Sequence, residues 1–419
     1  MTSIDALPQA PFLAGSVVRT GKQADVIDGI KPRVVVEPRT SEELASILAS
    51  ASRERLTVVF RGGGTRLGWG RIPQPIDLLI STRALNRVLA HEHADLTATV
   101  EAGATLDELA GTLGQHRQWL PLDRTGEAAT VGGAIATNDS GPLRHRFGTP
   151  RDLLIGVTLA TTDGRLVKAG GSVVKNVAGY DLGKLVSGSF GTLAAIVSAT
   201  FKLLPMPAAW HTLSAAFDTA DDTARAAAAV NDSQLEPVSL EVRTARSGRD
   251  AATYRLLVRF GTSPAAASAQ VEQARALVGA GEIIEGDAEA SLWRRYQAHT
   301  SSSAGTIVTL NWLPAMLARV LALLDEIAQT GASVELAARA GIGAGQLRLD
   351  GSMDWQAAAV ARLRGQSDLL RHVTIRDAPP AVKQAVDAWG PAGAAAAIGA
   401  AVKRALDPAG ILNAARGPI

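Results

Sequence analysis

The chain has no cysteine among its 419 residues. Disulfides, zinc–thiolate sites, iron–sulfur ligation and a cysteine nucleophile are therefore excluded for this chain itself. Aromatic residues make up only 4%, and 42 basic residues nearly balance 40 acidic ones. The charges are spread along the chain and do not form blocks. An extended nucleic-acid-binding surface, where basic residues would cluster, is therefore not expected.

Long apolar runs are also missing. No run of 18 apolar residues occurs, and residues 1–30 lack the basic start and apolar core of a signal peptide. We therefore expect a cytoplasmic protein without a transmembrane segment, peripheral at the inner membrane only through partner chains. The 47% hydrophobic content and the length allow two or three structural units, each with its own core.

Two common phosphate-binding motifs are absent as well. The sequence contains neither a G-x-G-x-x-G that opens a helix after a strand nor a G-x-x-x-x-G-K-[ST]. Gly183-Lys184 is followed by Leu185, so the metal-binding hydroxyl of the second motif is missing there. A nucleoside triphosphate held with Mg²⁺ is therefore not expected.

What the chain does have is glycine, and the most informative stretch is RGGGTRLGWG at residues 61–70. It follows an apolar run, residues 56–60, which predicts a short buried strand. Consecutive glycines let another molecule approach the backbone N–H groups, which in such a turn form a concave nest for an anion. Arg61 and Arg66 flank the triplet, and guanidinium groups suit phosphate. An ordinary turn is the alternative.

Two further glycine segments follow. Residues 126–141 read GEAATVGGAIATNDSG, in which Thr130 can cap a helix that begins with small residues and leaves room for a flat ligand. Close packing of helices by small residues is the alternative. Residues 170–191 read GGSVVKNVAGYDLGKLVSGSFG, with polar residues between the glycines. Residues 177–179 separate its two polar pairs, which indicates a folded loop more than a pair of groups acting on one atom.

Periodicity predicts a mixed α and β protein. Capping-box spacing before helices occurs at Thr40–Glu43 and at Thr105–Glu108. The first of these helices lies inside a predicted β-α-β unit, with the first glycine loop after its second strand. The alanine-rich stretch 391–405 predicts a buried helix. The other predicted strands of the first half cover residues 34–37, 96–101 and 194–204, with a hairpin over 152–169; in the second half, helices at 223–230, 265–278 and 315–327 alternate with strands at 239–242, 254–260, 306–310 and 346–349.

The three glycine segments in this order resemble the FAD-binding half of the vanillyl-alcohol-oxidase-type flavoproteins, also called the p-cresol methylhydroxylase (PCMH) fold. KNVAGYDL, within residues 173–205, is typical of the glycolate-oxidase and D-lactate-dehydrogenase branch. Within the superfamily the chain looks most like the FAD-binding E subunit of bacterial glycolate oxidase. The end of the chain, LDPAGILNAARG, resembles the closing motif of this branch, with Ala414-Ala415 where the branch usually has Pro-Gly.

This resemblance implies an α+β fold with a PCMH-type FAD-binding domain made of two α+β subdomains. The implied divisions are an N-terminal extension over 1–30, the FAD-binding domain over 31–205, a second α+β domain of the cap or substrate-domain kind over 206–370, and a C-terminal helical segment and tail over 371–419 that returns to the FAD domain.

The implied cofactor is FAD. Some relatives attach it covalently through a histidine in the first glycine loop, but here Thr65 follows the triplet and the loop has no His, Cys or Tyr, so non-covalent FAD is expected. Carried over by residue, the pyrophosphate would be wrapped by Arg61, Gly62, Gly63, Gly64, Thr65 and Arg66; the flavin and its phosphates would be lined by Pro121, Thr130, Val131, Gly132 and Gly133; Thr137, Asn138 and Gly141 would lie toward the isoalloxazine; and Gly191 and Ile196 would hold the adenosine end.

The catalytic relatives hold a divalent metal with paired histidines and a Glu-His step in their C-terminal half. Past residue 205 this chain has only isolated histidines, at 211, 299 and 372. The H-x-H of His91 and His93 is expected in an exposed turn. We therefore expect no metal site, and the sequence assigns no catalytic residue.

The resemblance thus implies an FAD-binding subunit of a glycolate (2-hydroxy acid) oxidase complex. A partner flavoprotein subunit would oxidise the small 2-hydroxy acid, and an iron–sulfur subunit would receive the electrons. Two alternatives stay open: a stand-alone FAD-dependent dehydrogenase that binds an acidic substrate with residues such as Arg243, Arg259 or Tyr254, and a non-catalytic assembly subunit.

Overall fold

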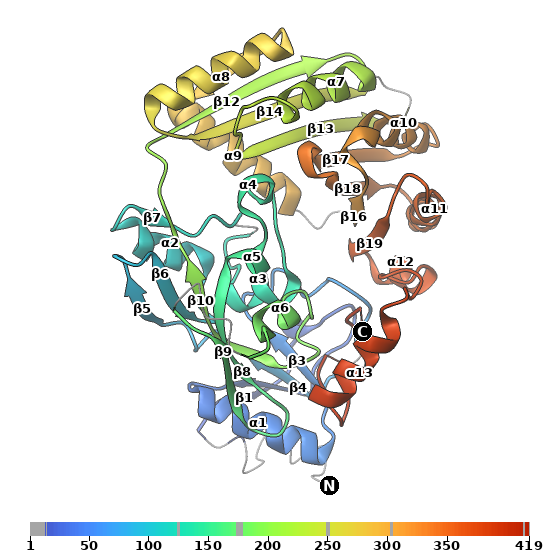
Figure 1. Cartoon of the computed structure of the whole chain (residues 1–419). Coiled ribbons are helices and arrows are strands. Elements are labelled where there is room, and N and C mark those ends of the chain that lie inside the picture. Colours follow the sequence, from blue (N-terminus) through green and yellow to red (C-terminus); the bar gives the residue numbers. More distant parts are fainter. Residues whose placement is uncertain are drawn as a thin grey trace. The chain divides into compact units, whose positions relative to one another are not determined.

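The computed structural model describes residues 13, 15–123, 126–172, 179–248, 252–301, 305–413 and 415–418. The chain divides into two compact units, whose elements are labelled in Figure 1. The first unit comprises Met1–Ser140, Thr149–Met206 and Pro391–Ile419, and the second comprises Gly141–Gly148 and Pro207–Gly390. No helix among the described residues is long and apolar enough to cross a membrane.

The first unit begins with a four-stranded sheet in the order β1-β2-β4-β3. β2 (Val34–Glu37) and β3 (Val58–Arg61) are joined by α1 (Ser41–Glu54), as predicted. They are not neighbours, however, because β4 (Leu78–Ser81) lies between them and is parallel to both. β1 (Val17–Thr20) adds an antiparallel edge.

A threonine cap and an apolar stripe fix helix α1. The Thr40 hydroxyl accepts a hydrogen bond from Glu43 N, and Leu44, Ile47 and Leu48 are buried against the sheet. These three positions lie on one helical face, since side chains three and four residues apart are neighbours. Val58 of β3 belongs to the same core as these residues of α1, so the packing fixes the position of the strand from which the glycine loop begins.

The second sheet of this unit is antiparallel, in the order β5-β6-β10-β8-β9. The predicted hairpin is present. The first glycine-rich helix packs on this sheet, with Val131 and Ile135 in the same core as Phe201. The strands are β5 (Val88–Glu92), β6 (Thr97–Glu101), β8 (Leu154–Ala160), β9 (Leu166–Gly170) and β10 (Ala195–Lys202); the helices are α2 (Leu106–Gly114), α3 (Val131–Thr137), α5 (Pro150–Leu153) and α6 (Leu182–Val186); β7 (Gln118–Trp119) pairs with β11 (Leu204–Pro205).

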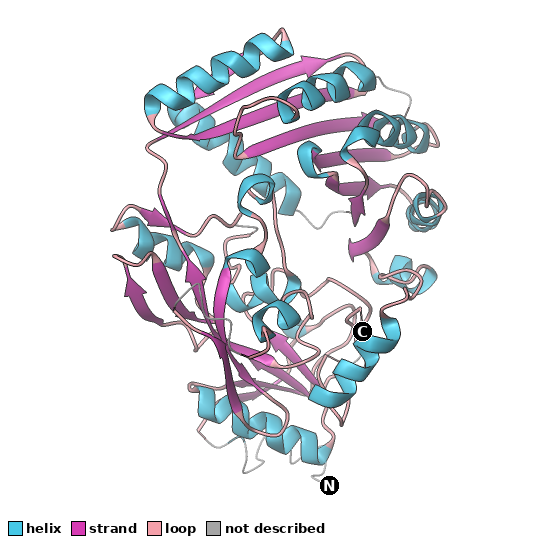
Figure 2. Ribbon diagram, viewed as in Figure 1, coloured by secondary structure: helices cyan, strands magenta, loops and turns pink. Residues whose placement is uncertain are grey.

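The second unit is built on one eight-stranded antiparallel sheet. Strand residues alternate between its faces, so Val258 and Ala338 contact one group of helices while Leu257 and Ala337 pack under α9 (Gly286–Ser301). Helices lie on both sides of the strands in Figure 2. The sheet order is β15 (Glu282–Glu285), β12 (Ala209–Phe217), β14 (Thr253–Thr262), β13 (Ser239–Ser247), β17 (Ser333–Arg339), β18 (Ala344–Asp350), β16 (Thr306–Asn311) and β19 (His372–Asp377); the helices on the first face are α7 (Ala220–Asn231), α8 (Pro264–Val278), α10 (Leu317–Ala328), α11 (Met353–Arg364) and α12 (Pro380–Ala385).

A short excursion from the first half of the sequence belongs to this second unit. Helix α4 (Arg144–Phe147) lies between α3 and α5 in sequence, yet residues 141–148 cluster with the second unit. Arg146 pairs with Glu236 at 3.0 Å. The His145 ring fills the space that a side chain at Gly341 would need, because a Cβ there would lie 2.5 Å from His145 Cε1. Burial, and then Arg146, lower the pKa of His145.

Two sequence expectations differ from the structure at the C-terminal end. Residues 371–390, expected in the C-terminal segment, contribute an edge strand, β19, and a helix, α12, to the second unit. The alanine-rich stretch does form a helix, α13 (Ala396–Leu406), but none of its residues is buried, so the prediction of a buried helix was wrong. Alanine favours the helical backbone in water as much as in a core, so composition predicted the helix without predicting its burial.

Candidate cofactor site

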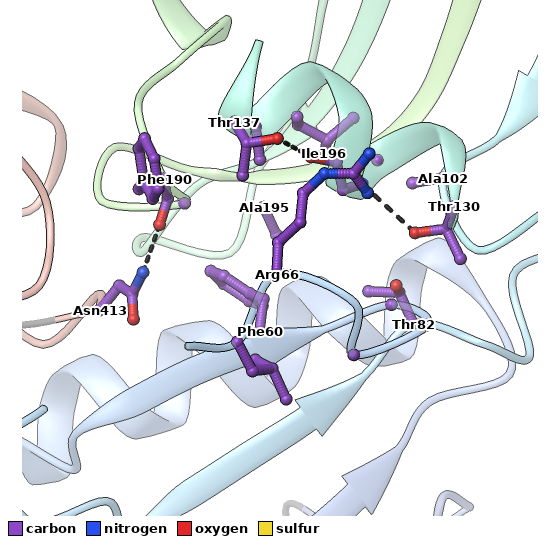
Figure 3. A pocket seen from close by; sticks show the side chains of 18 of the residues that line it. Phe60, Arg66, Thr82, Ala102, Thr130, Thr137, Phe190, Ala195, Ile196 and Asn413 are labelled. Atoms are coloured by element: carbon purple, nitrogen blue, oxygen red, sulfur yellow. Dashed lines mark hydrogen bonds between the residues drawn. The ribbon is translucent and has the colours of Figure 1, made fainter. Parts of the chain in front are cut away.

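An open pocket, whose empty space of about 800 Å³ includes the solvent at its mouth, lies in the first unit. The first glycine loop, helix α3, the segment leading into β10 and the end of the chain form most of its wall, and Thr82 after β4 and Ala102 after β6 add to it. Figure 3 shows the labelled side chains. The lining residues are Phe60, Gly62, Gly63, Gly64, Thr65, Arg66, Leu67, Trp69, Thr82, Ala102, Thr130, Gly132, Gly133, Ala136, Thr137, Phe190, Gly191, Ala194, Ala195, Ile196, Asn413 and Arg416.

The glycine loop is held by direct contact with the segment before α3. A Cβ at Gly63 would lie 1.5 Å from the Ala128 carbonyl oxygen, and one at Gly62 would lie 2.1 Å from Thr130 Oγ1. Gly64 adds a left-handed backbone conformation, with φ of +82°. Residues 62–63 must therefore be glycine for the loop to lie against its neighbour, which is what shapes this wall of the pocket.

Helix α3 presents small residues to the pocket. The Thr130 hydroxyl caps it by accepting from Gly133 N, as predicted. Gly132 lies against the turn that follows β6, because a Cβ at Gly132 would be 2.8 Å from the Cβ of Ala102. The Thr137 hydroxyl donates to the Gly133 carbonyl at 2.8 Å. The helix therefore leaves open space beside its backbone.

The charges of the wall are of one sign. The lining residues include two arginines, Arg66 and Arg416, and no Asp or Glu. The Arg66 side chain is only 7% exposed and extends across the cavity between Ala195 and Thr130 (Figure 3). It is paired with Asp139, which lies behind the wall. Burial lowers the pKa of Arg66 to about 10, so the guanidinium stays protonated at neutral pH.

The end of the chain completes the pocket. Val58 N donates to Ile411 O, and Asn413 N donates to Val58 O, so the tail lies alongside β3. The Asn413 amide donates to Phe190 O, and the buried Arg416 side chain donates to Leu67 O and to Trp69 O. The tail therefore ties together two parts of the pocket wall, the glycine loop and the turn before β10.

Two described residues of the tail that are not glycine, Asn413 and Ala415, have a positive φ, and the conformation is the less favourable for alanine. Ala415 has φ of +65°, in the left-handed region that favours glycine. It stands where the glycolate-oxidase branch usually has glycine. Alanine thus adopts here a backbone conformation in which its Cβ is unfavourable.

The structure brings eleven of the sixteen predicted cofactor residues together around this pocket; their contact with the cofactor remains a prediction. Five are placed elsewhere. Arg61 is bound to Asp25 at 2.7 Å, Val131 lies in the core, and Asn138 ends α3 and accepts from Arg151 N. Pro121 is not among the lining residues, and Gly141 belongs to the second unit.

Sequence reasoning missed the other half of the lining. Thr82 and Ala102 follow strands whose ends meet at the pocket, and no motif marks them. Arg416 is about 350 residues from the glycine loop that it contacts, and Asn413 is 223 residues from Phe190. The closing motif indicated that the tail returns to this domain, and its polar residues were the available signal.

Only part of the loop predicted for the third glycine segment lies within the described residues. Lys175 and Asn176 lie outside the described residues. Asp181 caps α6 by accepting from Lys184 N, and Tyr180 is 92% exposed. Neither residue lines the pocket.

The histidines of the first unit gather more closely than expected. The rings of His93 and His116 are stacked at 4.6 Å, and His91 lies 5.2 Å from His116. His91 Nε2 is 2.9 Å from Gln118 Oε1. Within the described residues, no three His, Asp or Glu side chains have the geometry to hold a metal ion.

The residues considered for an acidic substrate are engaged in the second unit. Arg259 is bound to Glu289 and lies between the rings of Trp210 and Trp293, at 4.1 and 4.8 Å. The Tyr254 hydroxyl donates to Asp325, and burial raises its pKa. Arg243 lies over the Tyr296 ring at 5.3 Å. These contacts fit structural roles.

Comparison with known proteins identifies the class. Residues 32–170 match the family model described as FAD binding domain. A solved structure titled chitooligosaccharide oxidase superposes with a TM-score of 0.72 at 14% identity, covering 99% of this chain and 98% of that one. The chain thus contains an FAD-binding domain of the PCMH type, in an α+β fold, and FAD is the cofactor of this domain.

Among curated proteins the chain is similar to 2-hydroxy acid enzymes. Glycolate oxidase subunit GlcD of Bacillus subtilis is 33% identical over 211 residues, which cover 50% of this chain and 45% of that protein. D-lactate dehydrogenase of Archaeoglobus fulgidus is 36% identical over 214 residues, covering 51% and 48%. The chain thus spans about half the length of these curated relatives.

Proposed function

We propose that the chain binds FAD without a covalent bond and serves as the FAD-binding subunit of a 2-hydroxy acid oxidase or dehydrogenase complex of the glycolate type. The observation that carries the proposal is the pocket itself. It combines two buried arginines, a glycine wall and no acidic side chain, which suits an anionic cofactor. No His, Cys or Tyr occurs among the described lining residues, in keeping with non-covalent binding.

The pocket offers distinct groups to the parts of FAD. Arg66 and Arg416 supply positive charge, and Gly62 to Gly64 supply close-lying backbone, for the pyrophosphate. Apolar contacts from Phe60 and Ile196 suit the ring systems. When bound, FAD supplies the redox chemistry by accepting two electrons from an organic substrate. The chain's own part is to bind, orient and exclude water.

The proposed partners follow from what this chain does not supply. Because this chain has no cysteine to ligate an iron–sulfur cluster, the cluster that receives the electrons in the proposed complex would belong to a separate subunit. A catalytic flavoprotein subunit would bind the 2-hydroxy acid. Arg259 and Tyr254 are already paired with Glu289 and Asp325. These contacts favour substrate binding by a partner subunit over a stand-alone dehydrogenase that would bind the substrate through these two residues. We place the complex in the cytoplasm, peripheral at the inner membrane through its partners.

Turnover with and without partners tests this function. The purified chain alone should reduce an artificial acceptor with glycolate or D-lactate at least about a hundredfold more slowly than the co-purified complex, because the described lining residues include no Asp, Glu, His, Lys or Tyr to act as an acid or base. Rates are compared per bound FAD, with and without a chelator. Brisk turnover by the chain alone, unchanged by the chelator, would favour the stand-alone dehydrogenase. A complex equally active without this chain's FAD would favour an assembly role.

A further inference from the structure

The pair formed by Arg66 and Asp139 is the most deeply buried charge pair at the cofactor pocket. Arg66 Nε lies 2.9 Å and Nη2 lies 2.5 Å from the same Asp139 oxygen, Oδ2. The exposed fractions of the two side chains are 7% and 1%. Arg66 also donates from Nη1 to Thr65 Oγ1 at 3.0 Å. The two partners come from different walls, 73 residues apart in sequence.

The two residues differ in their access to the cavity. Arg66 lines it, whereas Asp139 does not. Asp139 is fixed behind the wall, because Asn138 ends α3 in a left-handed conformation and Asp139 N then donates to Ala134 O. A molecule in the pocket can therefore contact Arg66 directly. It has no direct contact with Asp139, which can affect it only through Arg66 or through its charge.

Removing one member of such a pair leaves a buried charge without compensation, which is strongly destabilising. Without cofactor, Asp139 is the acid that compensates Arg66. A dianionic pyrophosphate beside Arg66 would compensate the same cation. Asp139 would then be a second negative charge close to the phosphates, in a site of low dielectric where repulsion is strong.

We propose that Asp139 is the counterion of Arg66 in the cofactor-free protein, and that the pyrophosphate of FAD takes over this role on binding. Asp139 is thus a positioning residue that keeps the empty pocket stable and limits cofactor affinity. The inference rests on the proposed binding of the FAD pyrophosphate by Arg66, and it goes further by assigning a role to a residue that does not line the pocket.

The linkage between folding and binding gives the direction of the effect. Asp139→Asn keeps the side-chain shape and an oxygen acceptor for Arg66 but removes the charge. It should destabilise the cofactor-free protein more than the FAD-loaded protein. Because a change that disfavours only the free form strengthens binding by the same factor, the affinity for FAD should rise by about tenfold.

The test uses the full chain, stripped of flavin and titrated with FAD. We expect Asp139→Asn to lower the melting temperature of the flavin-free protein more than that of the loaded protein, and to lower the FAD dissociation constant. Asp163→Asn, which removes an exposed acid paired with Arg165 in the same unit, is the matched control and should change neither. Weaker FAD binding by Asp139→Asn, or equal losses of melting temperature, would overturn the proposal.

A second variant covers the case in which Asp139→Asn does not fold. The double variant Arg66→Met with Asp139→Asn removes both charges, so its flavin-free form should fold near wild type while FAD binds more weakly. FAD affinity equal to wild type in this variant would show that Arg66 is not a cofactor ligand and would overturn the inference. Wild-type protein that fails to bind FAD would instead refute the proposed function, a separate outcome.

Discussion

Replacing Gly63 by alanine is expected to abolish FAD binding. The added Cβ would sit 1.5 Å from the Ala128 carbonyl oxygen and 2.5 Å from its carbon, and both are backbone atoms that cannot rotate away. The loop would have to leave the segment before α3, taking Thr65 and Arg66 with it. We expect protein purified without flavin, with at least about a hundredfold loss of affinity, since misplaced groups lose most of their binding energy.

The matched control for this experiment is Gly111→Ala. Gly111 lies in α2 of the same unit, and a Cβ there meets nothing within 4 Å. Alanine should be neutral or stabilise the helix by up to about 1 kcal/mol. Flavin titrations and thermal unfolding of both variants decide the matter. A Gly63→Ala protein that folds and binds FAD as well as wild type would contradict the packing that we describe for this loop.

The second large effect is expected in the second unit, from Glu289→Gln. Glu289 is buried and holds Arg259 at 2.7 Å through Oε1 and at 3.2 Å through Oε2. The same carboxylate accepts from Thr212 Oγ1, which in turn accepts from Trp293 Nε1. The amide would leave the Arg259 charge buried between two tryptophan rings without a counterion. We expect a loss of about 3–5 kcal/mol in the free energy of unfolding.

Two further variants separate the lost charge from other effects. Glu272→Gln removes an exposed partner of Arg275 on α8, where about 0.5 kcal/mol or less is expected. Arg259→Met combined with Glu289→Gln removes both charges and should regain most of the loss. Urea unfolding followed by tryptophan fluorescence measures all three. A Glu289→Gln protein as stable as the Glu272→Gln control would show that this buried pair does not stabilise the unit.

The sequence was most predictive where the signal is local. The capping box at Thr105–Glu108 is present in full, with both reciprocal hydrogen bonds. Thr40 caps α1, but Glu43 turns its carboxylate to Arg39 N and Ser16. Apolar runs also predicted β3, which leads into the glycine loop, and β10, which follows the third glycine segment. Buried strands are rich in apolar residues, and this enrichment can be seen in the sequence.

Sequence reasoning failed where partners are distant. β4 is inserted between β2 and β3, and such a strand order depends on contacts that no local pattern encodes. Arg61 and Arg66 have the same chemistry beside the glycine triplet, yet Asp25 engages the first and the pocket receives the second. Only the positions of Asp25 and Asp139, 36 and 73 residues away from their partners, distinguish the two arginines.

The central claim is that the pocket of the first unit holds FAD without a covalent bond. The most direct measurement is the visible absorbance of the purified chain, followed by acid precipitation and quantification of flavin in the supernatant and in the pellet. We predict a yellow protein with about one FAD per chain, all of it released into the supernatant. A colourless protein that cannot be reconstituted with FAD, or flavin retained in the pellet, would contradict the account.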